Sequence, residues 1–119
     1  MNSYVLTGGL LVGAPIKGRR VLIVDDVITA GTAIRESLET LRSAEALLSG
    51  VVVSLDRQEM VSDSVRESAI QQVEKVAGAP VCAIVRLKHL VAYLETQPGT
   101  TSEQLEAIRQ YRTTYGVEY

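Results

Sequence analysis

The most distinct pattern in the chain is an apolar run, Val21–Asp25, that ends in an acid and gives way to a helical period. An uninterrupted apolar run of this length predicts a strand that is buried on both faces. From Thr32 to about Ala44, apolar residues recur at intervals of four and three, which is the spacing of one helical face. The residues expected on that face are Ile34, Leu38 and Leu41.

Apolar runs and helical periods continue to alternate along the rest of the chain. The predicted elements are strands over Val51–Leu55 and Val81–Val85, and helices over Asp63–Ala77, over Leu87–Leu94 and from Thr101 or Ser102 onward. In the Asp63–Ala77 helix the residues expected to face inward are Val65, Ala69, Val73 and Val76, and in the last helix they are Leu105, Ile108 and Tyr111. No strand is expected before residue 10.

Strand and helix alternate three times, which predicts a right-handed α/β arrangement with a mainly parallel sheet of about three to four strands and flanking helices. With 119 residues, the chain is expected to form one domain, 1–119. It contains neither Phe nor Trp, so its core must be aliphatic. An aliphatic, β-branched core suits parallel strands packed under helices.

Charge and cysteine content argue against several functional classes. The net charge is −2, which offers no basic surface for nucleic acid or an anionic membrane. No apolar run approaches the length of a membrane span, and the first residues do not resemble a signal peptide. The single cysteine, Cys82, lies among apolar residues and is expected to be buried. Because one cysteine cannot form an internal disulfide, a cytoplasmic location is expected.

Candidate chemistry gathers where the first predicted strand ends. Two adjacent carboxylates, Asp25 and Asp26, are followed by a loop of small residues, Thr29–Ala33, that leads into a helix. Ligands of α/β proteins bind outside the carboxyl ends of the strands. Small residues allow the backbone to approach a phosphate, and a helix N-terminus offers it free N–H groups. Carboxylates suit sugar hydroxyls or a metal ion, so the segment predicts a site for a phosphorylated sugar.

The segment VLIVDDVITAGTA, residues 21–33, resembles the phosphoribosyl-diphosphate motif of the type I phosphoribosyltransferases. More narrowly, the chain from about Gly8 onward is similar to the C-terminal half of the orotate phosphoribosyltransferases. The segments that carry this narrower resemblance are LVGAPIKG at 11–18, VVSLDRQEMV at 52–61, AYLE at 92–95 and RQYRTTYG at 109–116. The resemblance implies a partial type I phosphoribosyltransferase fold that lacks its N-terminal strands.

That resemblance also implies an activity. Enzymes of this family join orotate to the ribosyl group of phosphoribosyl diphosphate, releasing pyrophosphate and forming orotidine 5′-monophosphate in pyrimidine biosynthesis. Mg²⁺ assists and is expected to arrive with the substrate, with no metal ligand from the protein. The complete family members are homodimers.

The resemblance also implies roles for individual residues, according to their positions in the matched segments. Asp25 and Asp26 are expected to be the catalytic residues and to hold the ribose hydroxyls. The segment expected to bind phosphoribosyl diphosphate consists of Asp25, Asp26, Val27, Ile28, Thr29, Ala30, Gly31, Thr32 and Ala33. Thr29 and Arg57 are expected to bind orotate, since the planar guanidinium matches a carboxylate or paired carbonyl groups.

The chain also departs from the family pattern. The family carries a mobile catalytic loop with a lysine and a histidine just upstream of the position of Gly8, whereas residues 1–7 contain no basic residue. The interpretation is a truncated or alternatively started member that binds substrate and scarcely reacts on its own. Two alternatives are open: a non-catalytic phosphoribosyl-diphosphate-binding module, and a phospho-acceptor receiver domain, whose phosphorylated aspartate would have to be Asp56.

Six side chains have more ordinary interpretations. Considered without the resemblance, Arg57 would be expected to form a surface ion pair with Asp56 or Glu59. Arg86 and Lys88 are expected to be surface charges. His89 is expected to be structural or exposed to solvent. Tyr111 and Tyr115, four residues apart, predict a packing pair on the last helix.

Overall fold

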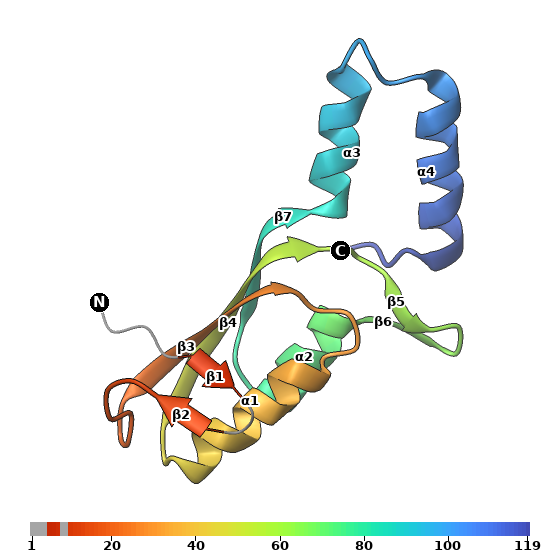
Figure 1. Cartoon of the computed structure of the whole chain (residues 1–119). Coiled ribbons are helices and arrows are strands. Elements are labelled where there is room, and N and C mark those ends of the chain that lie inside the picture. Colours follow the sequence, from red (N-terminus) through yellow and green to blue (C-terminus); the bar gives the residue numbers. More distant parts are fainter. Residues whose placement is uncertain (1–4, 8–9) are drawn as a thin grey trace.

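The centre of the molecule is a parallel three-stranded sheet. In a computed structural model of the chain, which describes residues 5–7 and 10–119, strands β3 (Arg20–Val27), β4 (Leu47–Asp56) and β7 (Val81–Arg86) lie in the order β3-β4-β7. Figure 1 shows that all three strands run toward the same end of the sheet. The α/β class and the three parallel strands predicted from the apolar runs are therefore confirmed.

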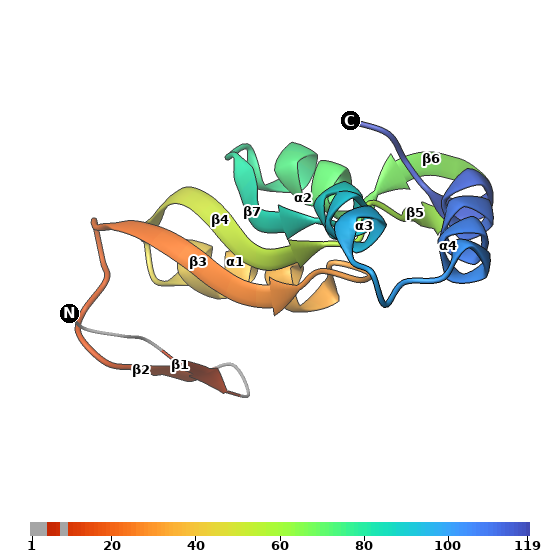
Figure 2. The same ribbon diagram turned by 90° about the horizontal axis from the view of Figure 1, so that it is seen from above.

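Two helices cover one face of this sheet. Helix α1 (Thr32–Ser43) follows β3, and α2 (Ala69–Ala77) precedes β7 (Figure 2). The predicted face of α1 is buried, and it packs on strand residues and on α2 in one aliphatic core. The core consists of Ile16, Ile23, Ile28, Ile34, Leu38, Leu41, Val51, Val53, Ala69, Ile70, Val73 and Val81. This packing fixes the direction in which β3 and β4 end.

The opposite face of the sheet is open. Its exposed apolar residues include Val24 and Ile84, which are 73% and 72% accessible, and Leu22 and Leu47. Cys82 lies on β7 between the buried Val81 and the half-buried Ala83 and is exposed. The expectation that Cys82 is buried was wrong, because alternate residues of a strand point to opposite faces and only one face is covered here.

Two short hairpins correct the predicted secondary structure. Strand β1 (Val5–Thr7) pairs antiparallel with β2 (Leu10–Val12), although no strand was expected before residue 10. Strands β5 (Met60–Ser62) and β6 (Val65–Ser68) form a second hairpin where the first part of a helix over Asp63–Ala77 was expected.

The helix α2 begins only at Ala69, where Ser68 and Gln71 form a capping box. As a result, the expected inward face is only partly correct. Ala69 and Val73 are buried, whereas Val65 lies on the hairpin and Val76 is 45% exposed.

The last two helices extend away from the sheet (Figure 1). Helix α3 (Leu87–Thr96) follows β7 directly, and α4 (Ser102–Tyr115) starts at a Thr101 cap, both as predicted. The expected packing of Tyr111 on Tyr115 is confirmed, with ring centroids 4.8 Å apart. None of the helices in the described part of the chain is both long and apolar enough to cross a membrane.

The chain then returns from α4 toward the sheet. Gly116 pairs with Glu59 in an isolated bridge, and the N–H of Val117 donates to the carbonyl of Gln58. The returning segment therefore lies beside the end of β4, although the two are far apart in the sequence.

Candidate functional site

The two predicted carboxylates lie in the last residues of β3, which continues to Val27. Asp25 is half-buried and Asp26 is exposed. The N–H of Val27 donates to Asp26 Oδ1 at 2.6 Å, and the N–H of Asp26 donates to Asp25 Oδ1 at 2.8 Å. The Val27 hydrogen bond, and next the contact with the Asp25 side chain, lower the pKa of Asp26 below its ordinary value. Asp26 therefore stays ionised at the open end of the strand.

The loop after β3 turns on Gly31, which precedes the first residue of α1. Gly31 has a φ of 74°, and a Cβ at this position would lie 3.1 Å from Val73 Cγ2. A side chain is therefore disfavoured both by the left-handed backbone and by the packing of α2. Among residues 5–7 and 10–119, no side chain caps the N-terminus of α1. Its first turn thus leaves N–H groups available to an anion.

A second loop, Asp56–Glu59, lies at the end of the neighbouring strand β4. Asp56 and Gln58 are each 3% exposed. Asp56 Oδ1 accepts from the N–H of Gln58 at 2.8 Å, and Gln58 adopts a positive φ of 50°. This left-handed residue forms a tight turn in which the buried Gln58 lies between the exposed Arg57 and the half-buried Glu59.

Arg57 pairs with Glu59 in the structure. Its Nη2 lies 3.0 Å from the carboxylate of Glu59, which also accepts from the hydroxyl of Tyr111 on α4 at 2.9 Å. The hydrogen bond to Glu59 raises the pKa of Tyr111. Arg57 remains 45% exposed at its side chain, so part of its guanidinium is accessible to a ligand.

The two loops meet at a pocket of about 100 Å³. Its lining comes from Ile28, Thr29 and Ala30 after β3, from residues 56–61 and from residues 68–70. The pocket thus brings together Thr29 and Arg57, the two residues expected to bind orotate. Asp25, Asp26, Val27, Gly31, Thr32 and Ala33 lie beside the pocket, along β3 and the start of α1, rather than in its lining.

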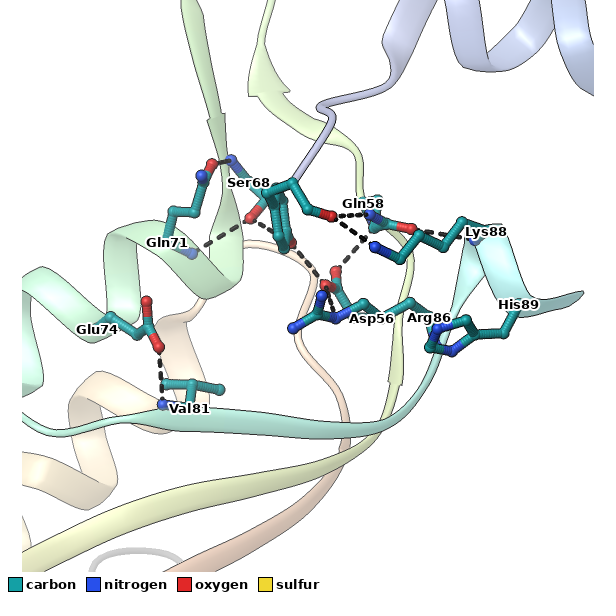
Figure 3. A network of polar contacts seen from close by, with 10 residues as sticks. Asp56, Gln58, Ser68, Gln71, Glu74, Val81, Arg86, Lys88 and His89 are labelled. Atoms are coloured by element: carbon teal, nitrogen blue, oxygen red, sulfur yellow. Dashed lines mark hydrogen bonds and ion pairs between the residues drawn. The ribbon is translucent and has the colours of Figure 1, made fainter.

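A polar network that shares Asp56, Gln58 and Ser68 with the lining of this pocket was not predicted from the sequence (Figure 3). The hydroxyl of Tyr119 donates to Asp56 Oδ2 at 2.6 Å and lies 2.8 Å from Ser68 Oγ. Arg86 lies 4.0 Å from Asp56 and over the ring of Tyr119, and Lys88 Nζ donates to the main-chain oxygen of Tyr119 at 2.9 Å.

The expectation that Arg86 and Lys88 are ordinary surface charges was therefore wrong. Both side chains turn inward because a buried carboxylate and a carbonyl attract them, and both are half-buried. His89 is exposed and accepts from the Arg86 N–H, as the structural interpretation predicted. No local signal in the sequence marks Tyr119, which lies 63 residues from Asp56.

In the part of the chain that the structure describes, no group of three or more His, Cys, Asp or Glu side chains could hold a metal ion. Two carboxylates at an open strand end nevertheless fit the usual environment of Mg²⁺ beside a phosphorylated substrate, where one or two carboxylates and the substrate's phosphates bind it. The site can therefore hold an anion at α1, hydroxyl groups at β3 and a planar acceptor at Arg57.

Comparison with known proteins gives a consistent result. The family described as a phosphoribosyl transferase domain matches residues 9–82. The chain is 54% identical over 110 residues to an orotate phosphoribosyltransferase of Klebsiella pneumoniae and 51% identical over 111 residues to one of Xanthomonas euvesicatoria. These matches cover 92% and 93% of the chain and 50% of each relative. The chain thus spans about half the length of the curated relatives it matches.

Solved structures agree. The orotate phosphoribosyltransferase of Francisella tularensis is 35% identical, with a TM-score of 0.80 over 91% of this chain and 52% of that one. The UMP synthase of Leishmania donovani is 30% identical, with a TM-score of 0.67 over 85% of this chain and 21% of its own. The partial phosphoribosyltransferase fold expected from the sequence is confirmed.

Proposed function

The chain belongs to the phosphoribosyl transferase domain family, and from this premise we propose that it binds phosphoribosyl diphosphate and orotate and takes part in phosphoribosyl transfer between them. The products are orotidine 5′-monophosphate and pyrophosphate, in pyrimidine biosynthesis. One observation carries the proposal: Thr29 and Arg57 line one pocket beside the loop that leads into α1, in a chain 54% identical to an orotate phosphoribosyltransferase.

The sugar phosphate binds along the end of β3. The ionised Asp26 and its neighbour Asp25 accept hydrogen bonds from the ribose hydroxyls, and charge-assisted bonds of this kind are strong. The 5′-phosphate lies against Thr29–Ala33, where the uncapped first turn of α1 and the threonine hydroxyls donate to it. Val27 and Ile28 carry the chain from the carboxylates to this loop, so their backbone forms the floor between the two.

Orotate binds in the pocket between the loops. The exposed part of the Arg57 guanidinium donates to the carboxylate or to paired carbonyl oxygens of the base, a planar match that lysine cannot make. Thr29 adds a hydroxyl from the other side of the pocket. Glu59 holds one nitrogen of Arg57 and leaves the remaining donors to the ligand.

In the transfer, a bond forms between orotate N1 and the anomeric carbon of the ribose while the bond from that carbon to pyrophosphate breaks. The N1 proton of orotate is released, and the bonding pair leaves with pyrophosphate. Positive charge builds on the ribosyl group, and the carboxylates of Asp25 and Asp26 stabilise it from the end of β3. Mg²⁺ bound to the diphosphate would supply charge neutralisation of the leaving group. Most of the protein's contribution is positioning.

Two other functions remain to be weighed. A non-catalytic phosphoribosyl-diphosphate-binding module would use the same loop and differ only in lacking turnover. A receiver domain would phosphorylate Asp56, but this carboxylate is 3% exposed and accepts from Gln58 and Tyr119. The burial of Asp56 and the family match argue against a receiver.

Two further expectations remain predictions. The resemblance predicts a homodimer, and the composition predicts a cytoplasmic location.

The test separates binding from turnover. At a phosphoribosyl diphosphate concentration about ten times its dissociation constant, with Mg²⁺, the chain should be stabilised against urea by about 1–2 kcal/mol. Orotate affinity, measured by calorimetry, should fall for Arg57→Ala and not for Arg66→Ala, which removes an exposed arginine on β6. Absence of any stabilisation by phosphoribosyl diphosphate would refute the proposal.

Pyrophosphate release is then followed with both substrates present. We expect slow release from this chain alone, because the basic residues expected upstream of Gly8 are absent from residues 1–7. Binding of both substrates with no detectable release would favour the non-catalytic module.

A further inference from the structure

Tyr119 joins three elements that are far apart in the sequence. Its hydroxyl donates to Asp56 at the end of β4 and lies within hydrogen-bond distance of Ser68, which ends β6 and caps α2. Asp56 and Ser68 are 3% and 2% exposed. Figure 3 shows both side chains at the centre of the polar network, between the end of β4 and the first turn of α2. The hydroxyl thus ties β4 to the hairpin that faces it.

The turn beside this hydroxyl is held from several sides. Gln58 lies in the left-handed region, which is unfavourable for a residue with a side chain. Its Oε1 accepts from the N–H of Lys88 at 3.0 Å, its Nε2 donates to the main-chain oxygen of Tyr119 at 3.4 Å, and its carbonyl accepts from Val117. A strained turn persists only where its surroundings determine it, and here α3 and residues 117–119 do so.

The turn decides where Arg57 points. Gln58 separates Arg57 from Glu59, and all three line the pocket. A change in the φ of Gln58 would move both charged side chains relative to Thr29 on the other wall. Tyr119 is not among the residues that line the pocket. Its influence on a ligand must therefore pass through the lining residues that it contacts, which are Asp56, Gln58 and Ser68.

The surroundings of Tyr119 also keep its hydroxyl a donor. Burial, followed by the hydrogen bond to Asp56, raises the pKa of Tyr119 above its ordinary value of 10.0. The guanidinium of Arg86 lies 5.5 Å from the ring centroid, where a cation is attracted to the aromatic face. Asp56 thus accepts from the Tyr119 hydroxyl through one oxygen and from the N–H of Gln58 through the other.

We propose that Tyr119 is a positioning residue for the base-binding side of the pocket, which it orders by fixing Asp56 and the Arg57–Glu59 turn. This inference rests on the proposed function, because it takes orotate as the ligand of Arg57. It assigns to the end of the described chain a part in specificity for the base and none in binding the sugar phosphate, whose loop belongs to β3 and α1.

The test uses the full chain and Tyr119→Phe, which removes only the hydroxyl. Tyr93→Phe is the matched control, because Tyr93 is 62% exposed on α3. Calorimetry with orotate should give an affinity about tenfold weaker for Tyr119→Phe and unchanged for the control, as expected for loss of an ordered charged donor. The affinity for phosphoribosyl diphosphate with Mg²⁺ should change by less than about twofold in both. Unchanged orotate binding by folded Tyr119→Phe, or an equal loss for both ligands, would overturn the inference.

A double-mutant cycle distinguishes positioning from a structural role. In an Arg57→Ala background, Tyr119→Phe should no longer weaken orotate binding, because its effect passes through Arg57. A further loss of the same size in that background would show that Tyr119 acts by another route and would also overturn the inference.

A ligand-free measurement keeps the inference testable if the proposed function fails. In Tyr119→Phe, amide hydrogen exchange should quicken at Gln58 and Lys88 and stay unchanged at Leu38 and Val53 in the core. Should the wild-type chain not bind orotate, the proposed function is wrong, and unchanged protection of Gln58 would then overturn the positioning of the turn as well.

Discussion

Strands β3 and β4 run side by side and end at the same edge of the sheet, yet the acids at their ends have opposite environments. Asp26 is exposed, and its carboxylate accepts from the N–H of the next residue. Asp56 is 3% exposed and accepts from Gln58 and from Tyr119, 63 residues away. The same residue type at equivalent topological positions is thus open to solvent in one case and held within the fold in the other.

The difference separates two ways of building a site. In the described part of the chain, the β3 end keeps Asp26 exposed and the first turn of α1 without a side-chain cap, so it can exchange water for a ligand. The β4 end uses its buried acid to order a turn, and the turn presents Arg57. A binding group must stay accessible, whereas the groups that orient it must be satisfied within the protein.

The largest expected effect is on stability, at the buried acid. Asp56→Ala leaves the N–H of Gln58 and the hydroxyl of Tyr119 without their acceptor, and should lower the free energy of unfolding by about 3 kcal/mol. Asp26→Ala, the matched change at the exposed acid, should leave it unchanged. Urea unfolding followed by circular dichroism measures both. Equal losses for the two variants would erase the contrast between the strand ends.

The second effect is on ligand binding, and it should arise at the acids of β3 rather than at the buried acid of β4. The pair Asp25→Asn and Asp26→Asn, made together, should weaken phosphoribosyl diphosphate binding by about a hundredfold, because neutral amides make weaker bonds to ribose hydroxyls. Asp63→Asn, at an exposed position between β5 and β6, is the control. Calorimetry on folded protein decides the matter, and an affinity equal to that of the control would remove the proposed role of both carboxylates.

The third and smaller effect concerns the loop at Gly31, between β3 and α1. Gly31→Ala should cost about 1–2 kcal/mol of stability, since an L side chain at a φ of 74° is strained and its Cβ meets Val73. Gly18→Ala shares the strain, with a φ of 71°, but its Cβ would meet nothing within 4 Å. The difference between the two unfolding free energies therefore measures the contact with α2. If Gly18→Ala is the more destabilising, the loop is not packed as described.

The two strand ends also differ in how far the sequence predicts them. The β3 end is local: Val21–Asp25, the small loop and the face of α1 follow one another within about 25 residues, and their pattern alone predicts the elements. The β4 end depends on contacts with Arg86, Lys88 and Tyr119, which no periodicity connects to Asp56. The resemblance was therefore enough to assign a role to Arg57. The contacts that hold its turn in place could not be predicted in this way.

Two predictions from the sequence were wrong, each for its own physical reason. Val65, Ala69 and Val73 recur at intervals of four and favoured a helix, although the Ser68 and Gln71 pair, a capping signature, marks the true start of α2. Cys82 was expected to be buried because its neighbours are apolar. Whether a strand residue is buried depends on which faces of the sheet are covered, and the sequence of one strand does not contain that information.

The smallest expected effect is on the pH dependence of stability. Burial and the hydrogen bond to Asp56 raise the pKa of Tyr119 from its ordinary 10.0, so the folded chain retains a proton that the unfolded chain loses. The stabilisation by Tyr119 is therefore fully present below pH 10 and is lost as the pH rises above it. Above pH 10, the free energy of unfolding should fall more steeply with pH for the wild type than for Tyr119→Phe.

Tyr111 shares this alkaline range, because its hydrogen bond to Glu59 also raises its pKa. It differs in lying on the surface of α4, where solvent screens the interaction. Tyr111→Phe should accordingly change the slope less than Tyr119→Phe does, in urea unfolding series measured from pH 9 to pH 11. The order of the two slopes tests whether the Tyr119–Asp56 contact is better shielded from solvent than the Tyr111–Glu59 contact. If Tyr111→Phe flattened the slope more, the contact that orders the Arg57 turn would be the one at Glu59 and not the one at Asp56.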